Sequence, residues 1–365
     1  MVSPEIVVDD LSGDGPYAVV VEADRGALLY HSLKYGRFLK QLMPAARCEY
    51  LVALEGSRPV AALPTFALDH PVHGAVVNSL PFYGSHGGIL SSPEASREAL
   101  AGLYRAFHER NRAGGAIAAT VVGNPLGSAS VPPEPAPDLT DRRIGQFSPL
   151  PPRGEPEEVA DRLFGQYHQK TRNMVRKGLK AGYVMRDDGS PAMFAALARM
   201  HEEGMRAIGG KFKGPGFFAA VQSAFDEGSD FRLFVAETSA GAIAAMVLVL
   251  YYRNYAEYFV PVSDADHRSN QPLSALIHHA MVESVIHNGS DCWNWGGTWL
   301  SQDGVYRFKS RWGTIDKEYE YHIWLYPENG DVTRLTRREL GAAYPDFFAV
   351  PYSALASEQM EAHDG

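Results

Sequence analysis

The stretch that decides the fold is DCWNWGGTWLSQDGVYRFKSRWG, residues 291–313. Its first part is short, aromatic and closed by Gly296-Gly297, which predicts a strand that reaches the end of a sheet. In its second part three rings alternate with three cations: Tyr306, Phe308 and Trp312 with Arg307, Lys309 and Arg311. A cation that is surrounded by aromatic rings is partly desolvated, so its electric field acts more strongly on neighbouring groups than it would in water. An amphipathic turn with its basic residues in water explains the same composition.

The whole chain has 365 residues, 45% of them hydrophobic, which predicts a sizeable core and two domains more readily than one. Its net charge of -9 argues against general coating of nucleic acid but leaves room for a local basic face. Cys48 and Cys292 stand in strand-like contexts and are predicted to be buried thiols, which indicates a reducing compartment. Without a long apolar run, the expected location is cytoplasmic, with no stable membrane insertion.

Hydrophobic periodicity predicts an α/β chain. A stretch rich in proline, residues 123–156, reads as a surface connection, so the expected domains are 1–150 and 151–335, with 336–365 as a tail. Strands are expected at 17–22, 48–54, 59–66, 116–122, 183–186, 231–238, 242–251, 255–260 and 318–326, and helices at 29–43, 94–112, 155–164, 167–181, 191–208, 216–227 and 271–288.

An internal repeat supports two similar lobes. Val52-Ala53 precedes Val60-Ala61 by the same spacing that separates Val235-Ala236 from Ile243-Ala244. The offset between the two pairs is about half the chain, as two tandem copies of one α/β unit would give. A chance match between two hydrophobic hairpins is the other explanation.

Basic residues on helices are the candidates for binding an anionic acceptor. Arg172 and Arg176 are four residues apart on one face, and arginine binds phosphate or carboxylate through two parallel N–H bonds. Lys34 and Arg37 share a face of the helix at 29–43, and Tyr83 lies in the glycine-rich loop 81–88. The alternatives are solvated helix charges for the basic residues and an ordinary turn for the loop with Tyr83.

Several chemistries have no sequence support. The chain has no H-E-x-x-H or C-x-x-C motif, so we expect no catalytic metal. It also has no P-loop and no G-x-S-x-G nucleophile elbow. We therefore expect no cofactor.

The segment from Gly304 to Gly313 resembles the Phe-Lys motif of Fem-type (FemXAB-like) peptidyltransferases, in the GNAT superfamily. The order of elements in the second half is similar to the GNAT acyltransferase fold, and the resemblance spans about residues 30–323. It implies two tandem GNAT-like lobes, each a mixed sheet flanked by helices. It also implies that Lys309 stabilises an oxyanion when an amine attacks an activated carbonyl, that Phe308 helps to fix it, and that Arg172 and Arg176 lie beside the acceptor.

The resemblance also bears on whether the donor is acyl-CoA or aminoacyl-tRNA. GNAT enzymes that use acyl-CoA hold its diphosphate on a glycine-rich loop before a helix, but residues 268–273 read RSNQPL, without glycine and with a proline that removes an N–H donor. We therefore expect aminoacyl-tRNA as donor, bound by Arg307 and Arg311 with Tyr306 and Trp312 stacking on its 3′ end.

Several questions stay open at this stage. The expected acceptor is a small peptide-like molecule or a nucleotide-linked cell-wall precursor. Asp303, Glu257 or the substrate itself would take the proton. An acyl-CoA-dependent N-acyltransferase, acting on exopolysaccharide or a small molecule, is the alternative enzyme, and a non-catalytic binding protein is a third reading.

Overall fold

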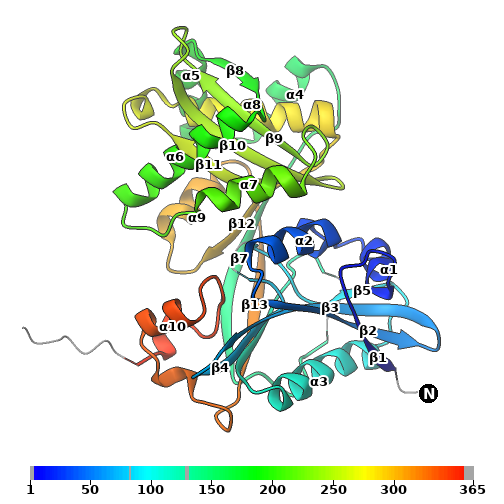
Figure 1. The fold of residues 1–365 in the computed structure, drawn as a ribbon. Helices are drawn as coiled ribbons and strands as arrows, with labels where there is room; N and C mark the ends of the chain where they lie inside the picture. Colours follow the sequence, from blue (N-terminus) through cyan, green and yellow to red (C-terminus); the bar gives the residue numbers. More distant parts are fainter. Residues whose placement is uncertain (1–3, 82–83, 128–130, 357–365) are drawn as a thin grey trace, which may run out of the picture. The chain divides into compact units, whose positions relative to one another are not determined.

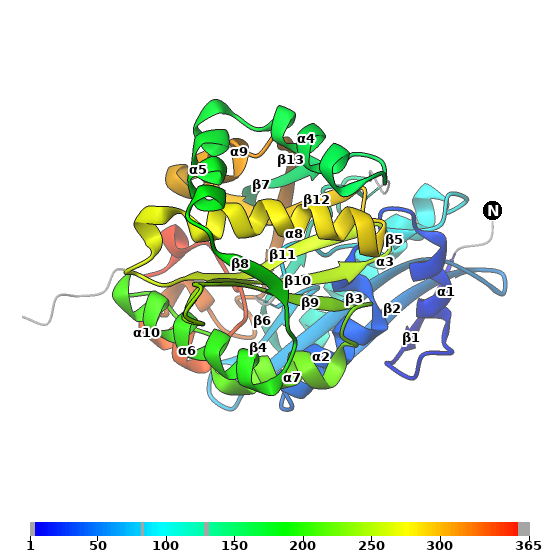
Figure 2. The same cartoon turned by 90° about the horizontal axis from the view of Figure 1, so that it is seen from above.

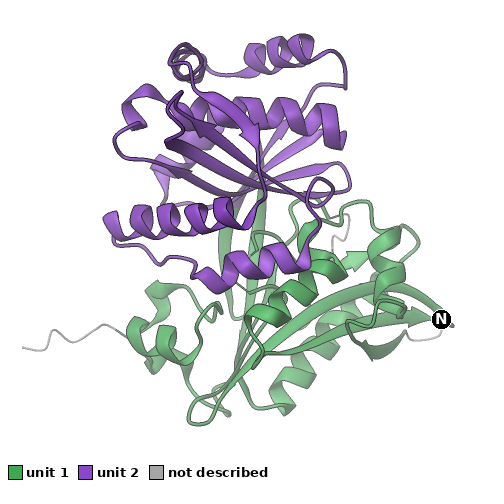
Figure 3. Cartoon of the chain, turned by 45° about the horizontal axis from the view of Figure 1, so that its top comes forward, with its two compact units in different colours: residues 1–143, 318–365 green, residues 144–317 purple. Residues whose placement is uncertain are grey.

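The structure is a computed structural model that describes residues 4–81, 84–127 and 131–356. The chain forms two compact units, one made of Met1–Arg143 with Glu318–Gly365 and the other of Ile144–Lys317 (Figure 3). Strands β7 (Leu139–Pro149) and β13 (Ile315–Leu325) each begin in one unit and end in the other. The compact units therefore divide the chain at other positions than the predicted limits of 150 and 335.

The first unit is a mixed sheet in the strand order β1-β2-β3-β4-β6-β13, with β5 beside β3. Its first four strands are antiparallel, and β4 and β6 are parallel. Helix α3 covers one face, whereas α1 and α2 lie on the other (Figure 1). The bounds are β1 Glu5–Asp9, β2 Arg47–Glu55, β3 Arg58–His70, β4 Gly74–Asn78, β5 Leu90–Ser91, β6 Ala116–Val122, α1 Pro16–Ala23, α2 Leu33–Leu42, α3 Arg97–Ala113 and α10 Arg337–Ala343, with 3-10 turns η1 Leu29–His31, η3 Val332–Arg334 and η4 Tyr352–Ala354.

The second unit has the strand order β7-β12-β11-β10-β9-β8. Strands β8 to β11 are antiparallel, and β11 and β12 are parallel. Figure 2 shows α8 on one face of this sheet and α6 and α7 on the other. The bounds are β8 Val184–Asp187, β9 Phe231–Glu237, β10 Ile243–Tyr252, β11 Tyr255–Ser263, β12 Cys292–Trp299, α4 Pro156–Gln166, α5 Gln169–Lys180, α6 Pro191–Ala207, α7 Pro215–Ala224, α8 Pro272–Asn288 and α9 Asp303–Ser310, with 3-10 turn η2 Arg268–Asn270.

The two units repeat one topology. Each runs strand, two helices, hairpin, strand, helix, parallel strand, as β1-α1-α2-β2-β3-β4-α3-β6, where the short strand β5 is inserted before α3, and as β8-α6-α7-β9-β10-β11-α8-β12. The hairpins of the sequence repeat are β2-β3, where Ala53 pairs with Ala61, and β9-β10, where Val235 pairs with Met246. The predicted fold of two lobes, each a mixed sheet flanked by helices, is confirmed.

Two predicted elements are wrong. Residues 17–22 form part of helix α1 rather than a strand, because Pro16 starts the helix and Tyr17, Val20 and Val21 form one buried stripe at helical spacing. The proline-rich connection is wrong for Leu139–Pro149, which is strand β7. Its one proline, Pro149, is the last residue of the strand, where a missing N–H is tolerated.

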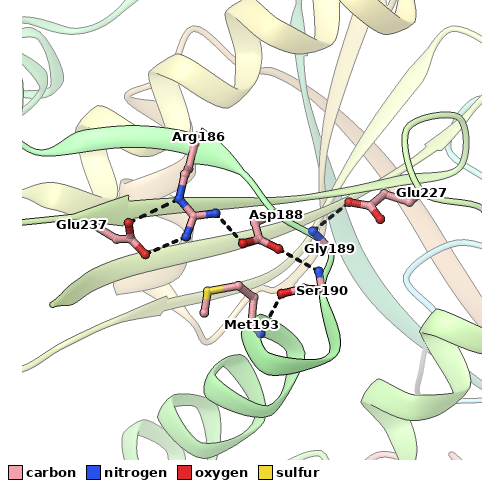
Figure 4. Close-up of polar contacts among 7 residues, drawn as sticks. All are labelled: Arg186, Asp188, Gly189, Ser190, Met193, Glu227 and Glu237. Carbon is pink, nitrogen blue, oxygen red and sulfur yellow. Dashed lines mark hydrogen bonds and ion pairs between the residues drawn. The ribbon is translucent and has the colours of Figure 1, made fainter. Parts of the chain in front are cut away.

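The start of α6 is fixed by a polar cluster on the edge strand β8 (Figure 4). The Arg186 guanidinium donates to both carboxylate oxygens of Glu237 on β9 and to Asp188. The N–H of Ser190 donates to Asp188 at 2.9 Å. Hydrogen bonding by the Ser190 side chain, then by Arg186 and by this N–H, lowers the Asp188 pKa to about 2. The cluster caps α6 and covers a sheet edge with charge, which disfavours pairing with another chain.

Each unit has its own apolar core between the sheet and the helix that joins its parallel strands. Cys48 and Cys292 are free thiols, and burial raises the pKa of each to about 12. Among the described helices, none is long and apolar enough to cross a bilayer.

Candidate functional site

The site begins where the parallel strands β11 and β12 separate. They pair at three positions, Tyr255 with Cys292, Ala256 with Trp293 and Glu257 with Asn294. Beyond that point β11 continues to Ser263 and β12 to Trp299 without a further pair between them among the described residues. The last paired residues, Glu257 and Asn294, therefore stand at the strand split.

Glu257 and Asn294 form a buried polar pair. The Asn294 Nδ2 donates to Oε1 of Glu257 at 3.1 Å, and the N–H of Gly296 donates to Oδ1 of Asn294 at 2.8 Å. Trp293 and Trp295 alternate with Asn294 along β12 and belong to the core beneath α8, so Asn294 lies on the opposite face. A carboxylate that is only 1% exposed is costly unless it is hydrogen-bonded, and this pair meets that need.

Lys309 on α9 brings a buried cation to the same strand. Its Nζ donates to the carbonyl oxygens of Gly296 and Gly297, at 3.3 and 3.1 Å, and to Oγ1 of Thr298 at 2.9 Å. Gly296 has φ 74°, a left-handed conformation that glycine adopts without strain. The side chain is 7% exposed, and its burial lowers the Lys309 pKa to about 8.

A chain of hydrogen bonds holds the Lys309 partner Thr298. The Thr298 hydroxyl donates to Oε1 of Gln146 at 3.2 Å, so its lone pair is left to accept from Lys309. Nε2 of Gln146 donates to Oδ1 of Asp316 at 3.3 Å, and the hydroxyl of Tyr306 donates to Oδ2 of Asp316 at 2.7 Å. This bond to Asp316 raises the Tyr306 pKa. Because Tyr306 and Lys309 share α9, these hydrogen bonds tie the middle and the last turn of that helix to the sheet.

Phe308 and Trp312 anchor α9 in the core. The ring of Phe308 lies edge-on to Trp295 at 5.9 Å and to Trp312 at 6.2 Å between centroids. Trp312 is 0% exposed and packs against Tyr167 at 4.9 Å. Stacking of Trp312 on the end of a tRNA would require its ring to leave this cluster, whereas Phe308 lies where it fixes the helix that carries Lys309.

The predicted donor and acceptor residues of the second unit adjoin one another. The N–H of His168, which caps α5, donates to the carbonyl oxygen of Arg311 at 2.9 Å. Arg307 on α9 is exposed and donates from Nε to the carbonyl oxygen of Asp303 at 3.3 Å. On α5, Arg172 donates to Oε1 of Gln169 at 2.7 Å, and the Arg176 guanidinium lies 4.7 Å from the centre of the Phe164 ring.

Three predicted acceptor residues lie elsewhere in the chain. Lys34 and Arg37 are on α2 of the first unit, where Arg37 donates to the carbonyl oxygen of Leu11 at 3.0 Å. That bond gives Arg37 a role in holding the loop after β1. Tyr83 lies outside the described residues.

The start of α8 is built differently from a diphosphate cradle. Gln271 has φ 60°, and its side chain accepts from Ser274 at 3.1 Å and donates to the carbonyl oxygen of Arg268 at 3.3 Å. Pro272 follows as the first helical residue. Helix α5 approaches so closely that a Cβ on Gly178 would lie 2.4 Å from the Gln271 carbonyl oxygen. Helix α8 therefore starts with a residue that has no N–H, and α5 packs against the Gln271 backbone, so this helix end offers a diphosphate one donor fewer and less room.

Sequence reasoning missed Asn294, Thr298 and Gln146 as members of the site. The signal for Asn294 was available, because a polar residue between two tryptophans in a buried strand needs a partner. Gln146 gave no signal, since its contact with Thr298 joins residues 152 positions apart.

Comparison with known proteins identifies the class of the second unit. Residues 165–310 match the family model of the acetyltransferase (GNAT) domain, so the unit carries a GNAT acyltransferase domain. No curated protein sequence matches the chain.

Solved structures show a similar fold over most of the chain. FemX is 14% identical, with a TM-score of 0.64 over 88% of this chain and 97% of that chain. A conserved protein of unknown function from Bacteroides thetaiotaomicron is 10% identical, with a TM-score of 0.55 over 89% of this chain and 100% of that chain. L-PGS from Bacillus licheniformis is 12% identical, with a TM-score of 0.50 over 85% of this chain and 91% of that chain.

Proposed function

We propose that this chain is an aminoacyltransferase that moves an aminoacyl group from aminoacyl-tRNA to the amine of a peptide-like or nucleotide-linked acceptor. The observation that carries the proposal is the buried ammonium of Lys309 at the strand split of a GNAT domain. A buried cation is expensive to maintain and is retained where a negative charge develops during a reaction.

The reaction would proceed by addition of the amine nitrogen to the ester carbonyl carbon. The new C–N bond forms, the carbonyl oxygen becomes an oxyanion, and the C–O bond to the ribose then breaks. Lys309 would turn one N–H from a backbone carbonyl toward the oxyanion, which favours the transition state over the ground state. The amine loses one proton and the ribose oxygen gains one, so the step balances.

Glu257 is the proton acceptor that we propose. It lies at the strand split and is linked to Lys309 through Asn294 and Gly296. Asp303, the other carboxylate considered from the sequence, is exposed at the start of α9. The buried carboxylate is better shielded from competing water.

The choice of donor rests on the start of α8. Acyl-CoA needs a diphosphate site there, and Gln271, Pro272 and the approach of Gly178 oppose one. A tRNA donor does not depend on that loop. The acyl-CoA reading is therefore the weaker alternative.

The test compares donors in one transfer assay. Purified protein is incubated with a mixture of amine acceptors and either charged tRNA carrying a radiolabelled amino acid or radiolabelled acetyl-CoA. We expect label in the acceptor only from charged tRNA, and none after ribonuclease treatment. Transfer from acetyl-CoA that ribonuclease does not affect would overturn the proposal and leave the GNAT fold in place.

A further inference from the structure

One face of α5 carries three lysines along its length. An α-helix turns by about 100° and rises about 1.5 Å per residue, so Lys170, Lys177 and Lys180 fall within about 80° of arc and span about 15 Å. All three are exposed, and no carboxylate pairs with any of them in the described chain. We call these three residues the lysine stripe.

The two arginines of α5 lie beside the stripe rather than in it. Arg176 faces α4, because its guanidinium lies over the Phe164 ring. Helix α4 is acidic in its first turn, with Glu157 and Glu158. At about 100° per residue, Lys170 and Lys177 lie about 120° and about 100° around the helix from Arg176, and Lys180 about 40°, so most of the stripe is turned away from α4 and a polyanion would meet less repulsion there.

The stripe leads toward Lys309. His168, two residues before Lys170, donates its N–H to the carbonyl oxygen of Arg311 at 2.9 Å. Arg311 lies two residues beyond Lys309. A phosphate strand that follows α5 toward its first residue therefore reaches the end of the helix that carries the buried lysine.

We propose that the lysine stripe binds the phosphate backbone of the RNA donor. This inference rests on the proposed function and adds a docking surface to it. Three cations along about 15 Å match an extended polyanion, whereas one or two phosphates of a small acceptor would reach only part of the stripe. The chain as a whole has a net charge of -9, so RNA is bound at this local face and repelled elsewhere.

An anionic membrane is the less suitable partner. A helix that lies on a bilayer inserts an apolar face between the headgroups. On α5 that face is Thr171, Val175 and Gly178, and it is buried in the unit, with Gly178 against Gln271 at the start of α8. The exposed side offers cations and one exposed apolar residue, Leu179, which is too little apolar surface to insert into a bilayer and suits phosphates in water better.

The experiment measures binding of fluorescent uncharged tRNA, so it does not depend on catalysis. The variant K170Q/K177Q/K180Q removes the stripe while keeping residues with good helix propensity. Binding should weaken at least about tenfold, and the slope of log affinity against log salt should become shallower by about two to three. The control R153Q/R199Q/R338Q removes three exposed arginines elsewhere and should bind like the wild type.

The outcomes separate this inference from the proposed function. Equal losses in the two triple variants, or no loss in either, would overturn the lysine stripe. So would stripe-dependent binding to vesicles of phosphatidylglycerol and phosphatidylcholine without stripe-dependent binding of tRNA. If the stripe variant binds tRNA normally and charged tRNA still supports transfer, the proposed function stands and the docking surface does not.

Discussion

Replacing Lys309 by methionine should change how stability depends on pH. Burial lowers the Lys309 pKa from its usual 10.5 to about 8. Between these values the unfolded chain binds more protons than the folded chain, so the free energy of unfolding rises with pH. Below the folded pKa the destabilisation by the buried ammonium is fully present, at about 3 kcal/mol, and it disappears as pH approaches the unfolded pKa.

The difference between wild type and Lys309→Met isolates this effect, because all other titrating groups occur in both proteins. From about pH 7 to about pH 10, the wild type should gain about 2 to 3 kcal/mol relative to the variant. Denaturant unfolding followed by tryptophan fluorescence suits the measurement, since Trp293, Trp295, Trp299 and Trp312 lie in the second unit. Lys317→Met is the control for loss of an exposed ammonium.

The same variant tests catalysis. If Lys309 stabilises the oxyanion, Lys309→Met should lower turnover about a hundredfold or more, on the scale of one lost oxyanion donor. Turnover of the wild type should fall as pH rises through about 8, because the ammonium is the active form. A stability difference that does not change with pH would show that Lys309 is not desolvated. A folded variant with near-native turnover would refute its catalytic role.

Two further predictions concern residues around Lys309. Replacing Arg172 or Arg176 by alanine should raise the KM for the acceptor more than it lowers kcat, because binding of an anionic group is similar in the ground and transition states. Lysine at either position should rescue poorly, because it lacks the planar guanidinium. Unchanged acceptor kinetics would show that both arginines are solvated surface residues. Thr298→Val removes an acceptor from the Lys309 ammonium, so its pKa should fall further and the loss of kcat at high pH should begin at lower pH. A pH profile of kcat that coincides with that of the wild type would show that Thr298 does not tune Lys309.

The sequence predicted elements whose signal is local. Residues 291–313 contain the aromatic, glycine-closed pattern that predicted strand β12, whereas the segment that forms helix α9 was read only as an amphipathic turn. The prediction for 17–22 was wrong because three consecutive valines favour a strand by propensity, while the burial that decides for a helix comes from tertiary packing. Strand β7 was missed because its partner β12 is far away in the sequence.

The candidate site was predictable only in part, because Lys309, Phe308 and Glu257 were named from the sequence, whereas Asn294, Thr298, Gln146 and the contacts among these residues were not. Lys309 stood out as a cation among rings, but its acceptors on Gly296, Gly297 and Thr298 depend on how α9 packs on β12. Sequence also cannot tell an exposed ring from a buried one in an alternating segment. That is why Trp312, which is core, had the same predicted role as Tyr306.

The repeat of one topology lets the two units be compared at the same position. In the first unit the last pair of the parallel strands is Asn78 with Thr120. The side-chain amide of Asn78 accepts from the N–H of Phe348 at 2.9 Å and donates to the carbonyl oxygen of Phe348.

Beyond that pair, Ser79 and Gly87 continue to bond along β6 by donating to the carbonyl oxygens of Thr120 and Gly123. The strand edge that would be open is thus occupied by backbone. In the second unit the corresponding pair is Glu257 with Asn294, and the carbonyls beyond it accept from an ammonium. Backbone partners satisfy hydrogen bonds only, whereas the buried carboxylate and the buried cation at the strand split of the second unit are the groups that we propose as proton acceptor and oxyanion donor. This difference between the two units is why we propose the reaction in the second unit.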